Sequence, residues 1–277
     1  MNTVPVLDMQ SSFTAHRVPL AGIERCEPTV LHEMLALLGV PVGQGQQPPD
    51  IPLTVRRLRA GESLFFEGSP APSIYIVRAG TFKAFHTAED GYEQVFGFAR
   101  RGDLLGCDAL SGDCHLMAAV ALEDASVYAI ALPDFYALAQ SLPAFYRGVM
   151  RAVSSAMIDL TQLADMMAAV AAEVRLARFL MHLSQRMAAC GQSARCLRLL
   201  MTRRDIGSYL GVAHETISRS FAALAALHLV KVEQRKVEIL DLAALQRFAQ
   251  GTRATAKADF SVSAPRTRAG GAMALAA

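Results

Sequence analysis

The chain has 277 residues, which is long enough for two modest domains that each bury a hydrophobic core. Its formal net charge is only +2, from 27 basic and 25 acidic side chains, so an argument from charge must rest on where the charges lie. No apolar run is long enough to cross a bilayer, and residues 1–20 lack the basic segment and apolar core of a secretory signal. A cytoplasmic protein without a membrane partner is therefore expected.

The five cysteines form no pattern typical of a disulfide framework or a clustered metal site. Their number is odd, and no two are spaced as Cys-x-x-Cys. Two pairs flank short segments and are candidate redox thiols, although ordinary free thiols are the commoner case. These pairs are Cys107 with Cys114 and Cys190 with Cys196, while Cys26 stands alone.

Residues 1–50 are predicted to form an N-terminal extension and linker. "TVLHEMLALLGV" predicts one short helix, and "PVGQGQQPPDIP" over residues 41–52 has a linker composition. From residue 51 to residue 144 the chain contains short strand-prone pieces separated by closely spaced glycines, which indicates an antiparallel β-sandwich or roll. Asp90-Gly91 between two of these pieces predicts a hairpin turn.

Residues 145–174 are rich in Ala, Met and Leu and predict one long helix. Apolar residues recur along it at spacings of three and four, which is the pattern of a coiled-coil seam. A helix that packs only on its own domain would give a similar stripe, but the absence of charge along this one favours a parallel homodimer. The predicted dimerisation residues are Met150, Val153, Met157, Leu160, Ala164, Met167 and Ala171.

Residues 175–250 predict a winged helix–turn–helix, preceded by a helix near residues 171–189. Thr202 followed by Asp205 forms a capping-box pattern at the start of a helix that ends at Leu210. A second helix is expected from about His214 to Leu227, and "LVKVEQRKVEIL" predicts two short strands around a basic turn. The small polar residues over 251–277 predict a disordered tail.

The spacing within "MTRRDIGSYLGVAHETISRSF" favours DNA recognition over an ordinary amphipathic helix pair. Gly207 and Gly211 lie where the helices cross and turn. The apolar residues spaced to lock the two helices together are Ile206, Leu210, Val212, Ile217 and Phe221. Residues 195–240 hold eight basic and four acidic side chains, so this segment is more positive than the whole chain. Basic side chains suit phosphate contacts.

Polar side chains near the start of the second helix are predicted to contact base edges in the major groove. Arg219 can bind guanine in a bidentate manner, Glu215 can accept from cytosine, and Ser218 can bond to either kind of group. The remaining predicted DNA contacts are His214, Arg203, Arg204, Arg235 and Lys236.

From about Ile51 to Phe248 the chain resembles the family of the catabolite activator protein and the fumarate–nitrate reductase regulator, FNR, and the FNR branch in particular. The stretches that carry the resemblance are "GDLLGCDAL", "MTRRDIGSYLG" and "ETISR". The resemblance implies an α+β protein with a β-roll (a double-stranded β-helix, similar to cyclic nucleotide-binding domains), a long dimerisation helix and a winged helix–turn–helix. It also implies a dimer that binds an inverted repeat like TTGAT-N4-ATCAA and contacts RNA polymerase.

The same comparison implies that neither usual cofactor of this family is bound. FNR holds an iron–sulfur cluster with a run of N-terminal cysteines and one in the β-roll, where this chain has only Cys26 and Tyr128. Catabolite-activator relatives hold a cyclic nucleotide with a Glu and an Arg-Ser pair, where this chain has Cys107 and the Arg-free stretch "DCHLMAA". A buried phosphate without a cation would be costly.

Three smaller departures concern the DNA-binding unit and the dimer. Ala213 replaces the Ser or Thr that caps the second helix in relatives, and Ser220 replaces an apolar locking residue, so Phe221 is expected to compensate. Leu160 replaces an acid that disfavours the cofactor-free FNR dimer, so this dimer is expected to persist without a ligand.

The expected function is sequence-specific transcription regulation, linked to oxygen limitation, nitrogen oxides or redox metabolism, without enzymatic activity. The alternative is a ligand- or haem-sensing β-roll that regulates a partner enzyme. Haem ligation by His32, His86 or His115 has no supporting spacing in the sequence. The signal, the target genes and the choice between activation and repression are left open.

Overall fold

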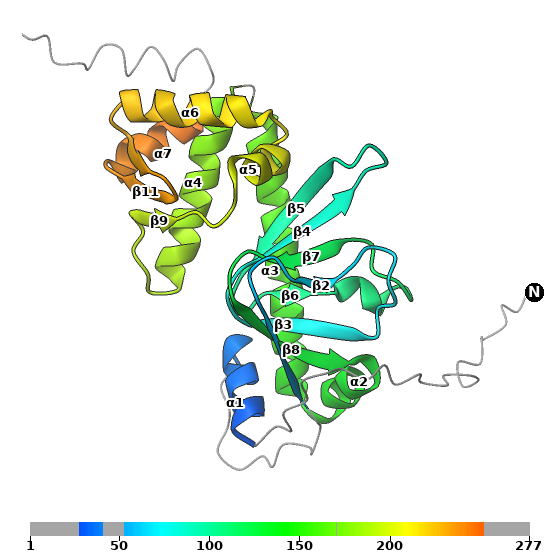
Figure 1. The fold of residues 1–277 in the computed structure, drawn as a ribbon. Helices are drawn as coiled ribbons and strands as arrows, with labels where there is room; N and C mark the ends of the chain where they lie inside the picture. Colours follow the sequence, from blue (N-terminus) through cyan, green and yellow to red (C-terminus); the bar gives the residue numbers. More distant parts are fainter. Residues whose placement is uncertain (1–27, 41–52, 170, 252–277) are drawn as a thin grey trace, which may run out of the picture.

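The computed structural model describes residues 28–40, 53–169 and 171–251. The predicted linker, Cys26 and the predicted C-terminal tail lie outside the described residues. Figure 1 shows a β-sandwich joined by one long helix to a smaller helical domain with a β-sheet of its own, so the predicted α+β class is confirmed. No helix in the described part of the chain is long and apolar enough to cross a membrane.

The sandwich consists of two four-stranded antiparallel sheets, with strand orders β1-β8-β3-β6 and β2-β7-β4-β5. Six of the strands lie in strand-prone pieces of the sequence, whereas β6 has only two residues and β7 consists of alanine and valine alone, so neither stood out. The strands are β1 (Thr54–Leu58), β2 (Ser63–Phe65), β3 (Ser73–Ala79), β4 (Phe82–Thr87), β5 (Glu93–Ala99), β6 (Leu104–Leu105), β7 (Ala118–Ala121) and β8 (Ala125–Ala131). A short 3₁₀-helix, η1 (Cys107–Leu110), follows β6.

The predicted N-terminal helix exists as α1 (Pro28–Leu37) and packs on the sandwich beside α2 (Leu132–Ser141). Met34 is fully buried in a core that also contains Phe145 and Val149 of the long helix. The carboxylate of Glu33 accepts hydrogen bonds from the guanidinium of Arg78 in β3. Helix α1 is therefore part of the N-terminal domain.

The long helix α3 (Pro143–Ala168) ends six residues before the predicted boundary at residue 174, and α4 (Ala172–Ala189) begins after a break. The prediction of Ala171 as a seam residue is therefore wrong: it precedes α4 and is only 8% exposed. The chain turns at the break because Ala171 and Val174 join Leu163 and Met166 in the core of the C-terminal domain. Tertiary packing overrides the helix propensity of this alanine-rich stretch.

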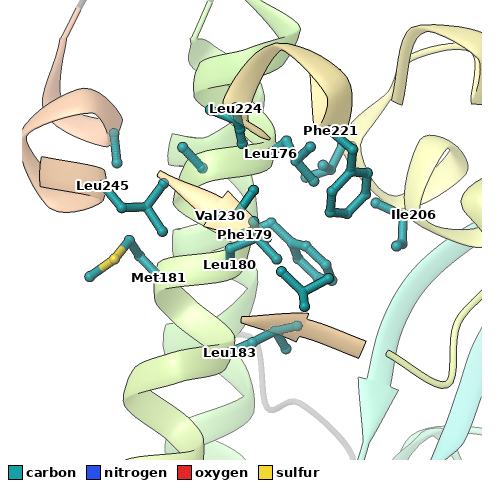
Figure 2. Close-up of a cluster of buried hydrophobic side chains, with 14 of the residues drawn as sticks. Leu176, Phe179, Leu180, Met181, Leu183, Ile206, Phe221, Leu224, Val230 and Leu245 are labelled. Atoms are coloured by element: carbon teal, nitrogen blue, oxygen red, sulfur yellow. The ribbon is translucent and has the colours of Figure 1, made fainter. Parts of the chain in front are cut away.

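The C-terminal domain surrounds α4 with three further helices and a three-stranded sheet. Figure 2 shows the apolar face of α4 packed against Ile206, Phe221, Leu224, Val230 and Leu245. The sequence missed β9 and α7, which close this core. The elements are β9 (Cys196–Arg198), α5 (Arg203–Leu210), α6 (His214–Ala226), β10 (Val230–Glu233), β11 (Lys236–Ile239) and α7 (Leu242–Gln250).

Gly80, between β3 and β4, has a φ of +85°, and an added Cβ would lie 2.5 Å from the Cβ of Ala125. Gly61 has a similar φ of +86° but open space around it. We expect Gly61→Ala to cost about 1–2 kcal/mol for the left-handed backbone alone, and Gly80→Ala to cost that amount plus about 1–3 kcal/mol for the clash. Denaturant unfolding of both variants measures the difference, and equal costs would contradict the close approach of β3 and β8 at this turn.

Candidate DNA-binding interface

Helix α5 begins at the predicted capping box. The hydroxyl of Thr202 accepts a hydrogen bond from the backbone N–H of Asp205 at 3.1 Å, and the Asp205 carboxylate accepts one from the backbone N–H of Thr202 at 2.8 Å. These bonds satisfy two of the N–H groups that a helix leaves without partners at its start. The start of the first helix of the predicted pair is thus set by residues of the helix itself and its N-cap.

The turn between α5 and α6 depends on two glycines, as predicted. An added Cβ at Gly207 would lie 2.7 Å from the carbonyl oxygen of Val212, so only glycine allows the chain to pass this close. Gly211 ends α5 with a φ of +65°, in the left-handed region that glycine adopts without strain. The turn therefore has the geometry of a helix–turn–helix.

Buried apolar side chains lock the two helices. Ile206, Leu210 and Ile217 have no exposed surface. Ser220 is also buried, and the neighbouring Phe221 fills the interface with the guanidinium of Arg203 3.6 Å above its ring. Arg203, predicted as a DNA contact, is thus half-buried between the helices, where it makes a cation–π interaction.

Helix α6 presents the predicted base-contacting side chains to solvent along one face, at the end of the domain far from the sandwich (Figure 1). The Nε2 atom of His214 lies 3.2 Å from a carboxylate oxygen of Glu215, and the hydroxyl of Ser218 donates to the His214 carbonyl. The guanidinium of Arg219 donates to the hydroxyl of Thr216 at 3.2 Å. The sequence did not single out Thr216, whose hydroxyl orients the arginine before any DNA contact.

The start of α6 has no side-chain cap, because its N-cap residue is Ala213 as the sequence indicated. Its first N–H groups are therefore open to an acceptor. A DNA phosphate is suited to this position at a helix N-terminus.

The basic turn between β10 and β11 forms a wing beside α6. Gln234 adopts a φ of +51° at the tip, and the following Arg235 and Lys236 are both exposed. The wing is held to the domain by β9, since the N–H of Leu199 donates to the carbonyl of Arg235 at 2.7 Å. Arg204 is likewise exposed at the start of α5.

The seam side of α3 is exposed apolar surface within this single chain. Met150, Met157, Leu160 and Met167 expose between 41% and 66% of their surface, while Ala164 is exposed and Val153 half-buried. A contiguous apolar stripe of this kind marks an interface with another molecule. Leu163 and Met166 point the other way, into the C-terminal core.

Arg175 at the start of α4 is a further residue that the sequence did not indicate. Its guanidinium donates to the carbonyl of Ala169 at 2.7 Å and to the carbonyl of Leu210 at 2.9 Å. It therefore ties the break after α3 to the end of α5.

The loop after η1 does not fit a cyclic nucleotide phosphate. The Asp108 carboxylate already accepts hydrogen bonds from the backbone N–H groups of Ala109 and Leu116 and lies 2.9 Å from Nδ1 of His115. The His115 ring is fully buried and stacks on Phe65 at 3.8 Å. An aspartate thus occupies the donors that an incoming anion would need, and its charge would repel one.

The residues present do not fit the iron–sulfur cluster of the FNR branch either. Tyr128, which the resemblance places at the position of a cluster cysteine, is fully buried in the sandwich. Among residues 28–40, 53–169 and 171–251, no three His, Cys, Asp or Glu side chains are grouped as metal ligands. Neither His32 nor His86 belongs to such a group.

The four cysteines within the described residues are free thiols. Burial and the neighbouring Asp108 raise the pKa of Cys107 to about 11, so its reactive thiolate form is scarce at neutral pH. Cys114, Cys190 and Cys196 are exposed free thiols.

Two domain families match the chain where the structure places its two domains. The cyclic nucleotide-binding domain matches residues 55–141, and the Crp-like helix-turn-helix domain matches residues 174–248. The chain is 38% identical over 197 residues to the transcriptional activator protein Anr of Pseudomonas protegens, covering 71% of this chain and 81% of that protein. It is 32% identical over 232 residues to the transcriptional regulatory protein btr of Bordetella pertussis, covering 83% and 96%.

Solved structures agree with this assignment. FixK2 from Bradyrhizobium japonicum matches with a TM-score of 0.64 and 26% identity, covering 71% of this chain and 97% of that one. The domain order, the helix–turn–helix geometry and the similarity over most of the chain lead to one conclusion. The chain belongs to the CRP/FNR family of transcription regulators, whose members bind DNA and dimerise.

Proposed function

We propose that this regulator acts as a homodimer that binds an inverted repeat resembling TTGAT-N4-ATCAA. The observation that carries the proposal is the exposed row of Glu215, Ser218 and Arg219 on α6 beside the basic wing. An arginine and a carboxylate one helical turn apart supply a donor pair for guanine and an acceptor for cytosine. The exposed Arg204, Arg235 and Lys236 supply cations for the phosphates on either side.

Dimerisation through α3 fits the exposed stripe. Two such stripes packed in parallel would remove the methionines and Leu160 from water without burying any charge. Asp159, the nearest acid, is turned away and bonded to Arg186 at 2.9 Å. A seam without buried charge favours a dimer that needs no ligand.

The regulator is further proposed to work without a cluster or cyclic nucleotide, as a cytoplasmic protein that recruits RNA polymerase. The buried Tyr128 and the Asp108–His115 pair support the first part of this proposal. The relatives include a fumarate and nitrate reduction regulatory protein from Vibrio cholerae, 36% identical over 192 residues. That likeness supports the proposal that the target genes belong to oxygen-limited, nitrogen-oxide or redox metabolism. It also supports the proposal that the protein is a regulator and not an enzyme.

The protein is expected to carry no iron–sulfur cluster even when purified without oxygen. Tyr128 offers a phenol where a thiolate ligand would be needed, and burial raises its pKa well above the ordinary value, so it stays protonated. Iron and acid-labile sulfide are measured per chain in anaerobic protein. A stoichiometric cluster would contradict this part of the proposal.

The dimer seam is tested with a matched pair of substitutions on α3. Leu160 and Ile158 are both 55% exposed, but only Leu160 belongs to the proposed seam. Leu160→Asp places two like charges in a poorly solvated interface and should weaken the dimer at least about tenfold. Ile158→Asp adds the same charge off the seam and should leave the dimer intact. Sedimentation equilibrium measures both; equal effects would place the interface elsewhere.

Base recognition is tested by comparing α6 with the wing. Arg219→Ala and Glu215→Ala should each cost about 1–3 kcal/mol per half-site, and should relax the choice of base at the contacted position. Lys236→Ala should weaken binding to all sequences alike and reduce the salt dependence, because it removes a phosphate contact. Binding to the inverted repeat and its single-base variants is measured across a salt series. Unchanged base preference in the α6 variants would mean that recognition lies elsewhere.

A further inference from the structure

The β4–β5 hairpin of the sandwich docks on α5, the first helix of the DNA-binding pair (Figure 1). Strand β5 is an edge strand, with backbone groups that no neighbouring strand satisfies. The hydroxyl of Ser208 on α5 accepts from the N–H of Val95 at 2.8 Å and donates to the carbonyl of Glu93 at 2.6 Å. One side chain of the DNA-binding domain thus satisfies two backbone groups of β5 that a further strand would otherwise pair with.

A buried lysine strengthens this docking. Lys83 in β4 is only 8% exposed, and its Nζ lies 2.6 Å from a carboxylate oxygen of Glu93 and 3.0 Å from one of Asp205. The second partner is the carboxylate that caps α5. Burial raises the pKa of Asp205, but hydrogen bonds from Thr202 and Lys83 outweigh it and hold the pKa below its ordinary value. Losing either charge would leave the other poorly solvated.

Apolar contacts complete the docking. Val95 is 1% exposed and belongs to the hydrophobic core of the DNA-binding domain rather than to that of the sandwich. The ring of Phe98 in β5 lies 5.2 Å from that of Tyr209 in α5 and 6.4 Å from that of Phe179 in α4. The hairpin and α5 therefore share one core and behave as a rigid unit.

A continuous helix does not connect the two domains, because α3 ends at Ala168 and α4 begins at Ala172. The side chains that join β4 and β5 to α5 therefore help to fix the orientation of one domain relative to the other. They act together with a second contact, in which Nη2 of Arg186 in α4 donates to both carboxylate oxygens of Asp103 after β5.

We propose that Lys83, Val95, Asp205 and Ser208 form an interdomain clamp that sets the spacer length of the recognised inverted repeat. The inference rests on the proposed dimer on α3, since the seam fixes the two sandwiches and each clamp then fixes one α6. Each added base pair moves a half-site by about 3.4 Å and rotates it by about 35°. Two recognition helices held rigidly cannot follow such a shift, so a wrong spacer loses base contacts in one half-site.

The clamp residues are thus positioning residues for DNA recognition, and they lie partly in the sensory domain. Their effect differs from that of α6 residues. Loosening the clamp leaves each half-site contact intact but allows the two half-sites to be reached at several separations. Spacer selectivity and base selectivity are therefore separable by experiment.

The experiment uses the full-length chain and DNA duplexes that carry TTGAT and ATCAA separated by two to six base pairs. Ser208→Ala removes the hydroxyl that joins the two domains, and Lys83→Met removes the buried cation while keeping much of the side-chain volume. Arg78→Met is the matched control, because Arg78 in β3 forms a partly buried ion pair with Glu33 of α1, away from the contact between β5 and α5. Thermal unfolding and sedimentation identify variants that remain folded dimers, and Kd is measured for every duplex.

The wild type and Arg78→Met should prefer one spacer over its neighbours by about 10–100-fold, the value of one lost bidentate base contact per dimer. Ser208→Ala and Lys83→Met should reduce this ratio several-fold, while single-base changes within a half-site keep their wild-type penalty. Clamp variants that select the spacer as sharply as the wild type would overturn the inference alone. A wild type that binds none of the duplexes would overturn the proposed function and this inference with it.

Discussion

The two-sided packing of α3 is the constraint on which the rest of the structure depends. Near its start, Phe145 and Val149 are buried against α1 and the sandwich, and near its end, Leu163 and Met166 are buried in the DNA-binding core. One face of the helix therefore packs against both domains, against the sandwich near its start and against the DNA-binding domain near its end. Its other side keeps an uncharged apolar stripe that the described residues leave exposed, and burying such a stripe against another molecule is favourable.

The break after α3 lets the chain change direction before it enters the DNA-binding domain. If the helix had continued, Ala171 and Val174 would have extended the stripe. Instead they turn into the C-terminal core, and Arg175 fastens the break to the end of α5. The orientation of α6 then follows from contacts between surfaces, including the docking of β5 on α5, and such contacts are where a signal or a mutation can act on DNA binding from a distance.

The sandwich matches the cyclic nucleotide-binding domain family, but its Asp108–His115 pair does not suit a bound anion. The Asp108 carboxylate accepts hydrogen bonds from two backbone N–H groups of its own loop, and the nearby His115 ring stacks on Phe65. This arrangement is consistent with a domain whose main task is mechanical: it holds α1, α3 and the β4–β5 hairpin in place.

Local sequence determined much of the DNA-binding unit, because its signals act over a few residues. The Thr202–Asp205 capping box, the close approach at Gly207 and the apolar residues that lock α5 to α6 are short-range requirements, and the structure has each of them. The tertiary structure alone decided where α3 ends, that Arg203 stacks on Phe221, and that the capping carboxylate of Asp205 also binds Lys83. Lys83 and Asp205 are 122 residues apart, and no periodicity or spacing rule connects positions that meet only when two domains pack together.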